Sequence, residues 1–343
     1  MDEDVVVVSP VNLCAQLRDS YCTLNRVSKP PLPYFSGQEF TVRSHTAPPP
    51  IPAPPDGLPV IELSKRFERQ QKHPAERCLL HPPSPGHVGN QIVHLKISRE
   101  IRFRDNRKSQ VGLVDILNVQ PTKNQGPQKN MTLFAKFYDP LYNDHDSYIY
   151  DRFYCCDYDY SHEVAVYKQL KPLQGKYIPK FYGSFTLELP IPGHDTNRLV
   201  RLILLEYIPG RSIKSHGAGD FSQQERQRLL KIMIDTELTM YKHGFKGGFY
   251  RHDDIIINYN SRCAQRTRPI VLVDFGVCNL LHDGPEWCEI PVARWMKREG
   301  GDVCLAISEW IDWDLDLWYN RIYAGNTEIA AIGIPFIPRD HLG

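Results

Sequence analysis

The sequence lacks an excess of charge of either sign and lacks long apolar runs. Its 343 residues contain 41 lysines and arginines against 40 aspartates and glutamates, which gives a formal charge of +1. Such a balance produces no global field that would draw the chain onto nucleic acid or an anionic membrane. No apolar run approaches the roughly 18 residues that indicate a membrane-spanning helix. We therefore expect neither nucleic acid nor a membrane as a partner.

Paired cysteines and a signal peptide are also missing. The nine cysteines include no C-x-x-C pair and no zinc-type spacing with histidine, and their odd number argues against a disulfide framework. The first ten residues are acidic and contain only four consecutive valines, unlike a secretory signal. These features predict an intracellular protein, cytoplasmic or nuclear and not secreted, with reduced thiols.

Proline is abundant but unevenly placed. Of the 28 prolines, 15 precede residue 90, with runs at 29–33 and 48–55. Proline lacks a backbone donor and fixes φ, so such runs favour extended polyproline II. We interpret residues 1–90 as a proline-rich, disordered arm, which is either a plain spacer or a docking segment for a protein partner.

Beyond residue 90 the sequence predicts a sheet and one helix. A short helix is expected to begin at Ser161 and to end before Pro172, and the acidic stretch 139–160 before it is interpreted as a loop insertion. Five β-branched and aromatic runs predict antiparallel strands: residues 92–97, 110–117, 131–138, 180–187 and 200–207.

The last third of the chain has a mixed pattern. Ser222 and Glu225 have the spacing of a capping box, which predicts a helix over residues 222–242. Two apolar runs flanking a polar turn predict a hairpin, and apolar spacing near the end predicts another helix over residues 303–323. We divide the chain into the arm, 1–90, and two lobes, 91–208 and 209–343.

Two motifs suggest phosphate chemistry. Asp274 follows an apolar strand and precedes Phe275 and Gly276, which is where a carboxylate can hold a divalent cation against phosphate oxygens. Alone, this triplet more often marks a strand-end turn than a cation site. Lys136 lies in a strand, 163 − 136 = 27 residues before the helical Glu163. Protein kinases use a strand lysine paired with a helix glutamate to orient the α- and β-phosphates of ATP.

Residues 91–323 resemble the protein-kinase-like domain proteins of filamentous fungi. The resemblance is carried by the phrases at 135–142, 160–167, 178–184 and 201–210. It implies an α+β, bilobal fold with a five-stranded amino-terminal lobe plus one helix and a mainly helical, shortened carboxyl-terminal lobe.

The same resemblance implies a set of ligands. ATP and Mg²⁺ would be the cofactors, with Lys136 and Glu163 as the ion pair and Asp274 as the magnesium ligand. The hinge that contacts adenine would begin with Glu206, Tyr207 and Ile208.

The sequence departs from the kinase pattern at the phosphate-binding loop. The expected G-x-G-x-x-G is reduced to residues 109–112, in which Gly112 alone remains, so that backbone cradling of phosphates is looser or absent. No A-P-E motif follows Asp274, and only 343 − 276 = 67 residues remain after Gly276. This leaves room for a small-molecule substrate, or for none.

The catalytic loop fits the kinase pattern H-x-D-x-x-x-x-N in two registers. In the first, Asp254 takes the place of the asparagine, and the positions of the base and of the histidine fall on Phe249 and Gly247. In the second, Asp253 is the base and Asn258 the metal ligand.

The first register is favoured, because the second places three isoleucines in a catalytic loop. Even there, Asp254 is an oxygen donor that can hold magnesium, and Asp253 can approach a hydroxyl group. Two functions stay open: a kinase-type phosphotransferase acting on a protein or small-molecule hydroxyl, and a pseudokinase that serves as a binding or scaffold module.

Overall fold

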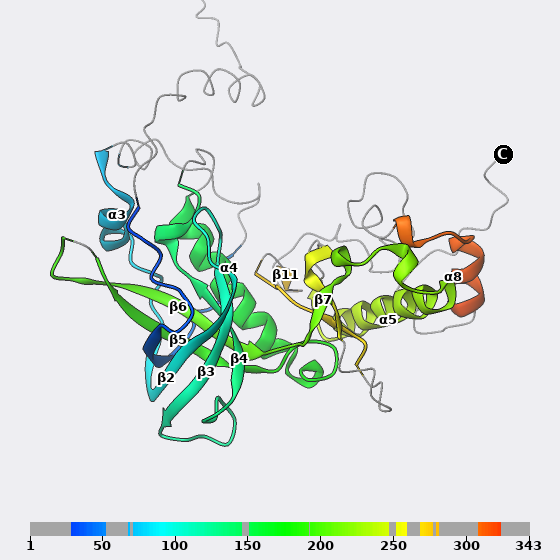
Figure 1. Cartoon of the computed structure of the whole chain (residues 1–343), viewed down its shortest axis with the longest axis horizontal. Coiled ribbons are helices and arrows are strands. Elements are labelled where there is room, and N and C mark those ends of the chain that lie inside the picture. Colours follow the sequence, from blue (N-terminus) through cyan, green and yellow to red (C-terminus); the bar gives the residue numbers. More distant parts are fainter. Residues whose placement is uncertain are drawn as a thin grey trace, which may run out of the picture.

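The computed structural model describes residues 29–52, 68, 71–145, 151–191, 193–246, 252–258, 268–276, 279–280 and 308–323. In Figure 1 the long strands and helix α4 lie at one end of the molecule, and helices α5 and α8 lie at the other.

The longest strands form a closed antiparallel barrel in the order β1-β2-β3-β4-β6-β5. Alternation builds its interior: in β2 the buried positions Gln91, Val93, Leu95 and Ile97 are separated by more exposed ones, as the two-residue period of a strand requires. The six strands are β1 (Glu39–Thr46), β2 (His87–Arg102), β3 (Gln110–Gln120), β4 (Thr132–Tyr138), β5 (Phe181–Pro190) and β6 (Asn197–Glu206).

The sixth strand, β1, comes from the segment that the sequence assigned to the proline-rich arm. It pairs with β2 over most of its length and with β5 at Arg43 and Ser44, which closes the barrel. Phe40 and Val42 point inward at alternating positions. The short helix α3 (Pro74–Leu80) comes from the same segment. The boundaries of the three predicted regions, at residues 90 and 208, stay a prediction.

Helix α4 (Arg152–Gln169) begins earlier than the sequence suggested. Asp151 caps it, accepting hydrogen bonds from the backbone N–H groups of Phe153 and Tyr154 at 3.1 and 3.4 Å. The interpretation of residues 139–160 as a loop is therefore wrong from Arg152 onward. Two 3-10 turns flank this region, η1 (Pro140–Tyr142) and η2 (Lys171–Leu173).

The later elements include the predicted capped helix and the predicted hairpin. Helix α5 (Gln223–Lys242) starts at the capping box of Ser222 and Glu225. Strand β9 (Ile255–Asn258) pairs with β10 (Ile270–Leu272) and with β7 (Gly210–Ser212). Smaller elements are η3 (Ile213–Ser215), η4 (Ala218–Asp220), β8 (Phe245–Lys246), η5 (His252–Asp254), β11 (Asn279–Leu280), η7 (Ser308–Trp310) and α8 (Leu315–Tyr323). Of the helix expected over residues 303–323, only the last part is an α-helix, α8. Residues 301–307 lie outside the described ranges.

The predicted bilobal kinase fold is wrong. In place of a five-stranded sheet the chain has a closed six-stranded barrel. In place of a mainly helical second lobe, the described residues after 208 contain five short strands and the α-helices α5 and α8. The described part of the chain has four α-helices in all, and none is long and apolar enough to cross a bilayer.

Candidate functional site

Lys136 is the centre of a cluster of charges inside the molecule. It lies on β4 between Val111 of β3 and Ile203 of β6, and its side chain is 7% exposed. Its Nζ lies 2.5 Å from Oε2 of Glu163 and 2.6 Å from Oδ1 of Asp274. The structure thus brings together three residues that the sequence singled out, from β4, from α4 and from the segment after β10.

Glu163 is the fully buried member of the cluster. Its Oε2 accepts a hydrogen bond from the Tyr138 hydroxyl as well as from Lys136. Its Oε1 has no hydrogen-bond partner among the described residues. Burial raises the pKa of the Glu163 carboxyl, against the attraction of Lys136. For Lys136 burial acts to lower the pKa, but the two carboxylates raise it above its usual range, so the lysine is charged at neutral pH.

Asp274 is the accessible member. Its side chain is 45% exposed, and its backbone adopts a left-handed φ of 65°, which is uncommon for a residue other than glycine. Burial raises its pKa, but Lys136 outweighs this and holds the pKa of Asp274 below its usual value. The next residue fixes the turn, because the buried Phe275 ring packs at 5.3 Å from Tyr167 and 5.7 Å from Phe245.

Asp159 belongs to the site, although the sequence analysis did not select it. Asp159 lies one helical turn before Glu163. It also packs against Gly276, where an added Cβ atom would lie 3.2 Å from the Cβ of Asp159. Its Oδ2 lies 3.9 Å from Nζ of Lys108, and its Oδ1 has no partner among the described residues. Burial raises the pKa of Asp159 to about 6. The spacing of four residues from Glu163 was the signal that could have found it.

The two predicted loop aspartates lie on the 3-10 turn η5. The carbonyl of Asp254 accepts a hydrogen bond of 2.8 Å from the N–H of Val273, next to Asp274, whereas the side chain of Asp253 is 58% exposed and lies 3.3 Å from Lys214. Asn258 is at the far end of β9, opposite Gly210. The choice between the two registers of the catalytic loop stays a prediction. Phe249 and Gly247 lie outside the described residues.

The predicted hinge residues are engaged in structural contacts. Glu206 accepts hydrogen bonds from Arg268 at 2.8 Å and from the Lys180 N–H at 2.9 Å. The Tyr207 hydroxyl accepts from Arg99 at 2.9 Å, and Ile208 is half-buried. The side chain of Glu206 is therefore committed to joining β5, β6 and the segment before β10.

Packing explains why residue 112 is a glycine. An added Cβ would lie 2.4 Å from Cζ of Phe103, so the Phe103 ring occupies the space that a side chain would need.

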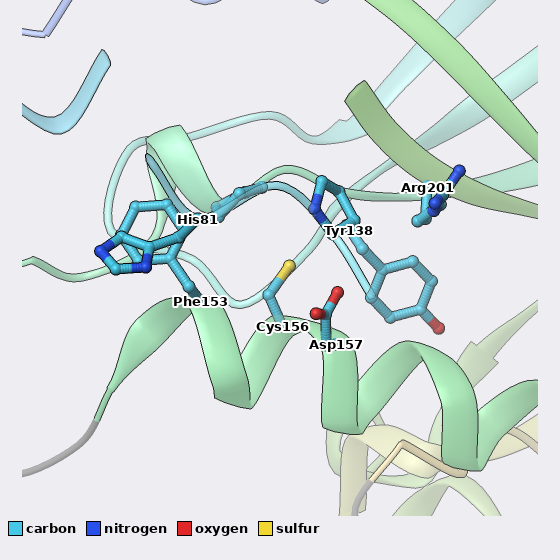
Figure 2. Close-up of a pocket in the computed structure, with 8 residues that line it drawn as sticks. His81, Tyr138, Phe153, Cys156, Asp157 and Arg201 are labelled. Atoms are coloured by element: carbon cyan, nitrogen blue, oxygen red, sulfur yellow. The ribbon is translucent and has the colours of Figure 1, made fainter. Parts of the chain in front are cut away.

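A small cavity lies beside the first half of α4 (Figure 2). Its volume of about 10 Å³ has room for about one water molecule, far below the roughly 300 to 1,000 Å³ of typical ligand pockets. Asp157, one of its residues, accepts two hydrogen bonds from Ser84. Lys136 and Asp274 are not among the lining residues, which are His81, Pro83, Tyr138, Pro140, Phe153, Cys156, Asp157 and Arg201.

The carboxylates of the cluster could bind a hard cation such as Mg²⁺ only if a bound ligand supplied further oxygen atoms. Within the described ranges no group of three or more histidines, cysteines, aspartates or glutamates is arranged to hold a metal ion. Mg²⁺ is often bound by one or two carboxylates together with substrate phosphates and water. Asp274 is half-exposed, and the backbone carbonyl of Asp254 accepts a hydrogen bond from the neighbouring Val273. That these two residues hold Mg²⁺ stays a prediction.

Comparison with known proteins gives little. No protein family matches the chain, and no curated protein matches it. Among solved structures, the kinase domain of PknI from Mycobacterium tuberculosis is similar over 53% of this chain and 59% of that domain, at 12% identity and a TM-score of 0.33. The similarity to a kinase domain is thus weak, and it spans less than two thirds of that domain.

Proposed function

We propose that the chain binds a nucleoside triphosphate with Mg²⁺ at the cluster of Lys136, Glu163 and Asp274. The observation that supports this most is that the buried Lys136 lies between two carboxylates, of which Glu163 is buried and Asp274 is half-exposed. A buried ion pair contributes little net stability over apolar packing, so a fully buried glutamate and lysine need another reason to be there. Perturbed charges gather at functional sites, and this cluster has the residue types of a kinase phosphate site.

Each residue has a distinct role in this proposal. Lys136 contacts the phosphate oxygens, and Glu163 fixes the direction of its ammonium group. Asp274 turns from Lys136 toward the cation, since its side chain is the exposed one. Asp254 supplies a second oxygen donor. When bound, Mg²⁺ neutralises the charge of the phosphates and so allows three anionic groups to gather around one lysine.

Phosphoryl transfer would need a base near the acceptor hydroxyl. Asp253 is the residue proposed for this role, because its side chain is exposed and its ion pair, with Lys214, lies at the surface. A pseudokinase that binds without catalysis is the second candidate. It is favoured by the first register of the catalytic loop, in which Phe249 takes the place of the base.

Thermal melting of the full chain tests the binding proposal. With about 1 mM ATP and a dissociation constant near 10 μM, mass action stabilises the protein by roughly 2.7 kcal/mol. That raises the melting temperature by about 5 to 10 °C for a domain of this size. We expect the rise with magnesium and a much smaller one with a chelator. No rise in either condition, at ATP concentrations up to several millimolar, would show that the proposal is wrong.

Variants then localise the effect. Asp274→Asn should remove the magnesium-dependent part of the shift, and its half-exposed position makes it the variant that best preserves the fold. Lys136→Met should remove the shift altogether. The matched control is Lys96→Met, on strand β2, which does not pair with β4, and opposite Glu39 in the register. A full shift in Asp274→Asn would exclude Asp274 as the magnesium ligand.

Catalysis is tested separately. If the protein transfers phosphate, Asp253→Asn should lower the rate of ATP turnover by orders of magnitude and leave the thermal shift with ATP nearly unchanged. Turnover that survives this change would exclude Asp253 as the base. Binding without any turnover in the unmodified protein would leave the pseudokinase as the function.

A further inference from the structure

The turn between β2 and β3 is rich in cations where kinases have glycines. Residues 102–108 contain three arginines and one lysine but no glycine, and the turn directly precedes the strand that pairs with β4. Backbone N–H groups exposed by glycine are the usual phosphate cradle of such a turn. Here the side chains offer an alternative source of positive charge.

The turn is held in place by its own contacts. Phe103 packs against Tyr34 at a centroid distance of 5.7 Å and against Phe137 at 6.4 Å. The Gln110 side chain accepts a hydrogen bond from the N–H of Arg104 and donates one to its carbonyl, at 2.8 and 2.7 Å. The cations of the turn are therefore attached to a fixed backbone, which reduces the entropic cost of binding.

Arg102 lies on the same face of the barrel as Lys136. The strand register pairs Arg102 with Val111 and Val111 with Lys136. Residues directly opposite one another in antiparallel strands point to the same side of a sheet. Arg102 is exposed, and its charge is among the influences that lower the pKa of Asp274. Arg102 is thus close enough to influence the charges of the cluster, while its side chain stays exposed.

Lys108 approaches the same cluster from the other side of the turn. Its side chain is 46% exposed, and its only described ion pair is the 3.9 Å approach to Asp159. Asp159 lies against Gly276, two residues after Asp274, and one turn before Glu163. A loosely held, half-exposed ammonium group next to the cluster is available to an incoming anion.

We infer that Arg102 and Lys108 form, with Lys136, a three-cation site for the terminal phosphates of a polyphosphate ligand, in which side chains of the β2–β3 turn take the place of a glycine-rich backbone cradle. The inference rests on the proposed function and adds to it a preference for triphosphate over monophosphate. Lys136 would hold the buried end of the phosphate chain, and the two exposed cations would hold the outer end.

Calorimetric titration of the full chain tests the inference. Mg-ATP, Mg-ADP, AMP and inorganic tripolyphosphate are titrated at one fixed salt concentration, because phosphate contacts depend on salt. The variants are Arg102→Gln, Lys108→Gln and the double change. The control is Lys123→Gln, an exposed lysine that follows the opposite end of β3.

We expect affinity to fall in the order ATP, ADP, AMP in the unmodified protein. Each single change should weaken ATP and tripolyphosphate binding by about tenfold, the effect of losing one hydrogen bond to a charged group. AMP binding should stay within about twofold, and the control should match the unmodified protein throughout.

The alternatives are separable. If ATP binds but both variants bind it as tightly as the unmodified protein, the three-cation site is wrong and the proposed function stands. If AMP weakens as much as ATP, the cations act on the fold rather than on the phosphates, and the inference is again wrong. If neither ATP nor tripolyphosphate binds the unmodified protein, the inference and the proposed function both fail.

Discussion

Lys136 is shared by two carboxylates whose exposures differ widely, 1% for Glu163 and 45% for Asp274. A ligand can therefore replace Asp274 as a partner of Lys136. It cannot replace Glu163 unless Glu163 leaves its buried position in α4. The same asymmetry separates their contributions to stability. Removing one partner of a buried pair leaves an uncompensated charge, whereas an exposed partner is replaced by water.

Glu163→Ala should lower the free energy of unfolding by about 3 to 5 kcal/mol, because Lys136 loses its buried partner and Tyr138 its acceptor. Urea denaturation measures the change. Glu188→Ala, on an exposed position of β5, is the control and should change stability by less than about 0.5 kcal/mol. Equal effects from the two changes would show that the buried pair has no special role in stability.

His45 on β1 should make the protein sensitive to acid. Burial, with the nearby charges of Arg201, His87 and Lys168, lowers its pKa to about 4, from an ordinary value of 6.5. A folded-state pKa below the unfolded one means that the unfolded chain binds the proton more readily, so stability is lost as pH falls from 6.5 toward 4.

Replacing His45 tests this dependence. His45→Gln should remove about 1 to 2 kcal/mol of the loss between pH 7 and pH 4, an amount reduced for partial solvent screening. Melting curves across this pH range provide the measurement, with His194→Gln on an exposed turn as the control. Parallel pH profiles for His45→Gln and the unmodified protein would contradict the prediction.

At the scale of single elements, sequence periodicity predicted those that bury one face. Helix α5 starts where its capping box places it, and the hairpin of β9 and β10 pairs as expected. Helix α4 was half missed, because it is buried on more than one side. Its first turns carry buried and half-buried aspartates and tyrosines, so no apolar stripe marks them.

The cap of α4 can be tested directly. Asp151→Ala removes the acceptor for the N–H groups of Phe153 and Tyr154 and should destabilise the protein by about 1 kcal/mol. Hydrogen exchange should quicken at the first turn of α4 and stay unchanged around Glu163, three turns later. Asp151→Asn, which keeps an oxygen acceptor, should restore most of the loss. Faster exchange along the whole helix would show that the cap controls more than its own turn.

Much of the candidate site followed from sequence spacing. Lys136, Glu163 and Asp274 were selected by residue type and order, and the structure places them in one cluster. Asp159 and the cations of the β2–β3 turn were not selected. Their proximity depends on the strand register and on the packing of Gly276 against α4, and neither can be read from local pattern.

On the scale of the whole molecule, the barrel was misjudged because composition hid β1. Flanking prolines marked the segment as an arm, yet Glu39–Thr46 has the alternation of a strand and two neighbours to pair with. Closure leaves β2 and β5 without free edges, which protects them from pairing with other chains.

A chain that begins at residue 91 should therefore fail to form a stable barrel. It lacks β1 and the first residues of β2, so that β5 and the remainder of β2 become exposed edges. We expect aggregation in gel filtration and no cooperative melting transition. A chain beginning at residue 29 is the matched control and should melt like the full protein. A monomeric, cooperatively melting chain from residue 91 would show that β1 is dispensable.

Closure by β1 also orders events during synthesis. Arg43 pairs with Thr186, a separation of 186 − 43 = 143 residues, so the first strand of the barrel to leave the ribosome waits for one of the last barrel strands to be made. Contacts so distant in sequence are slow to form and leave apolar strands uncovered meanwhile. At about 5 to 20 residues per second, that interval lasts roughly 7 to 29 seconds, long enough for a chaperone to bind the unfinished barrel.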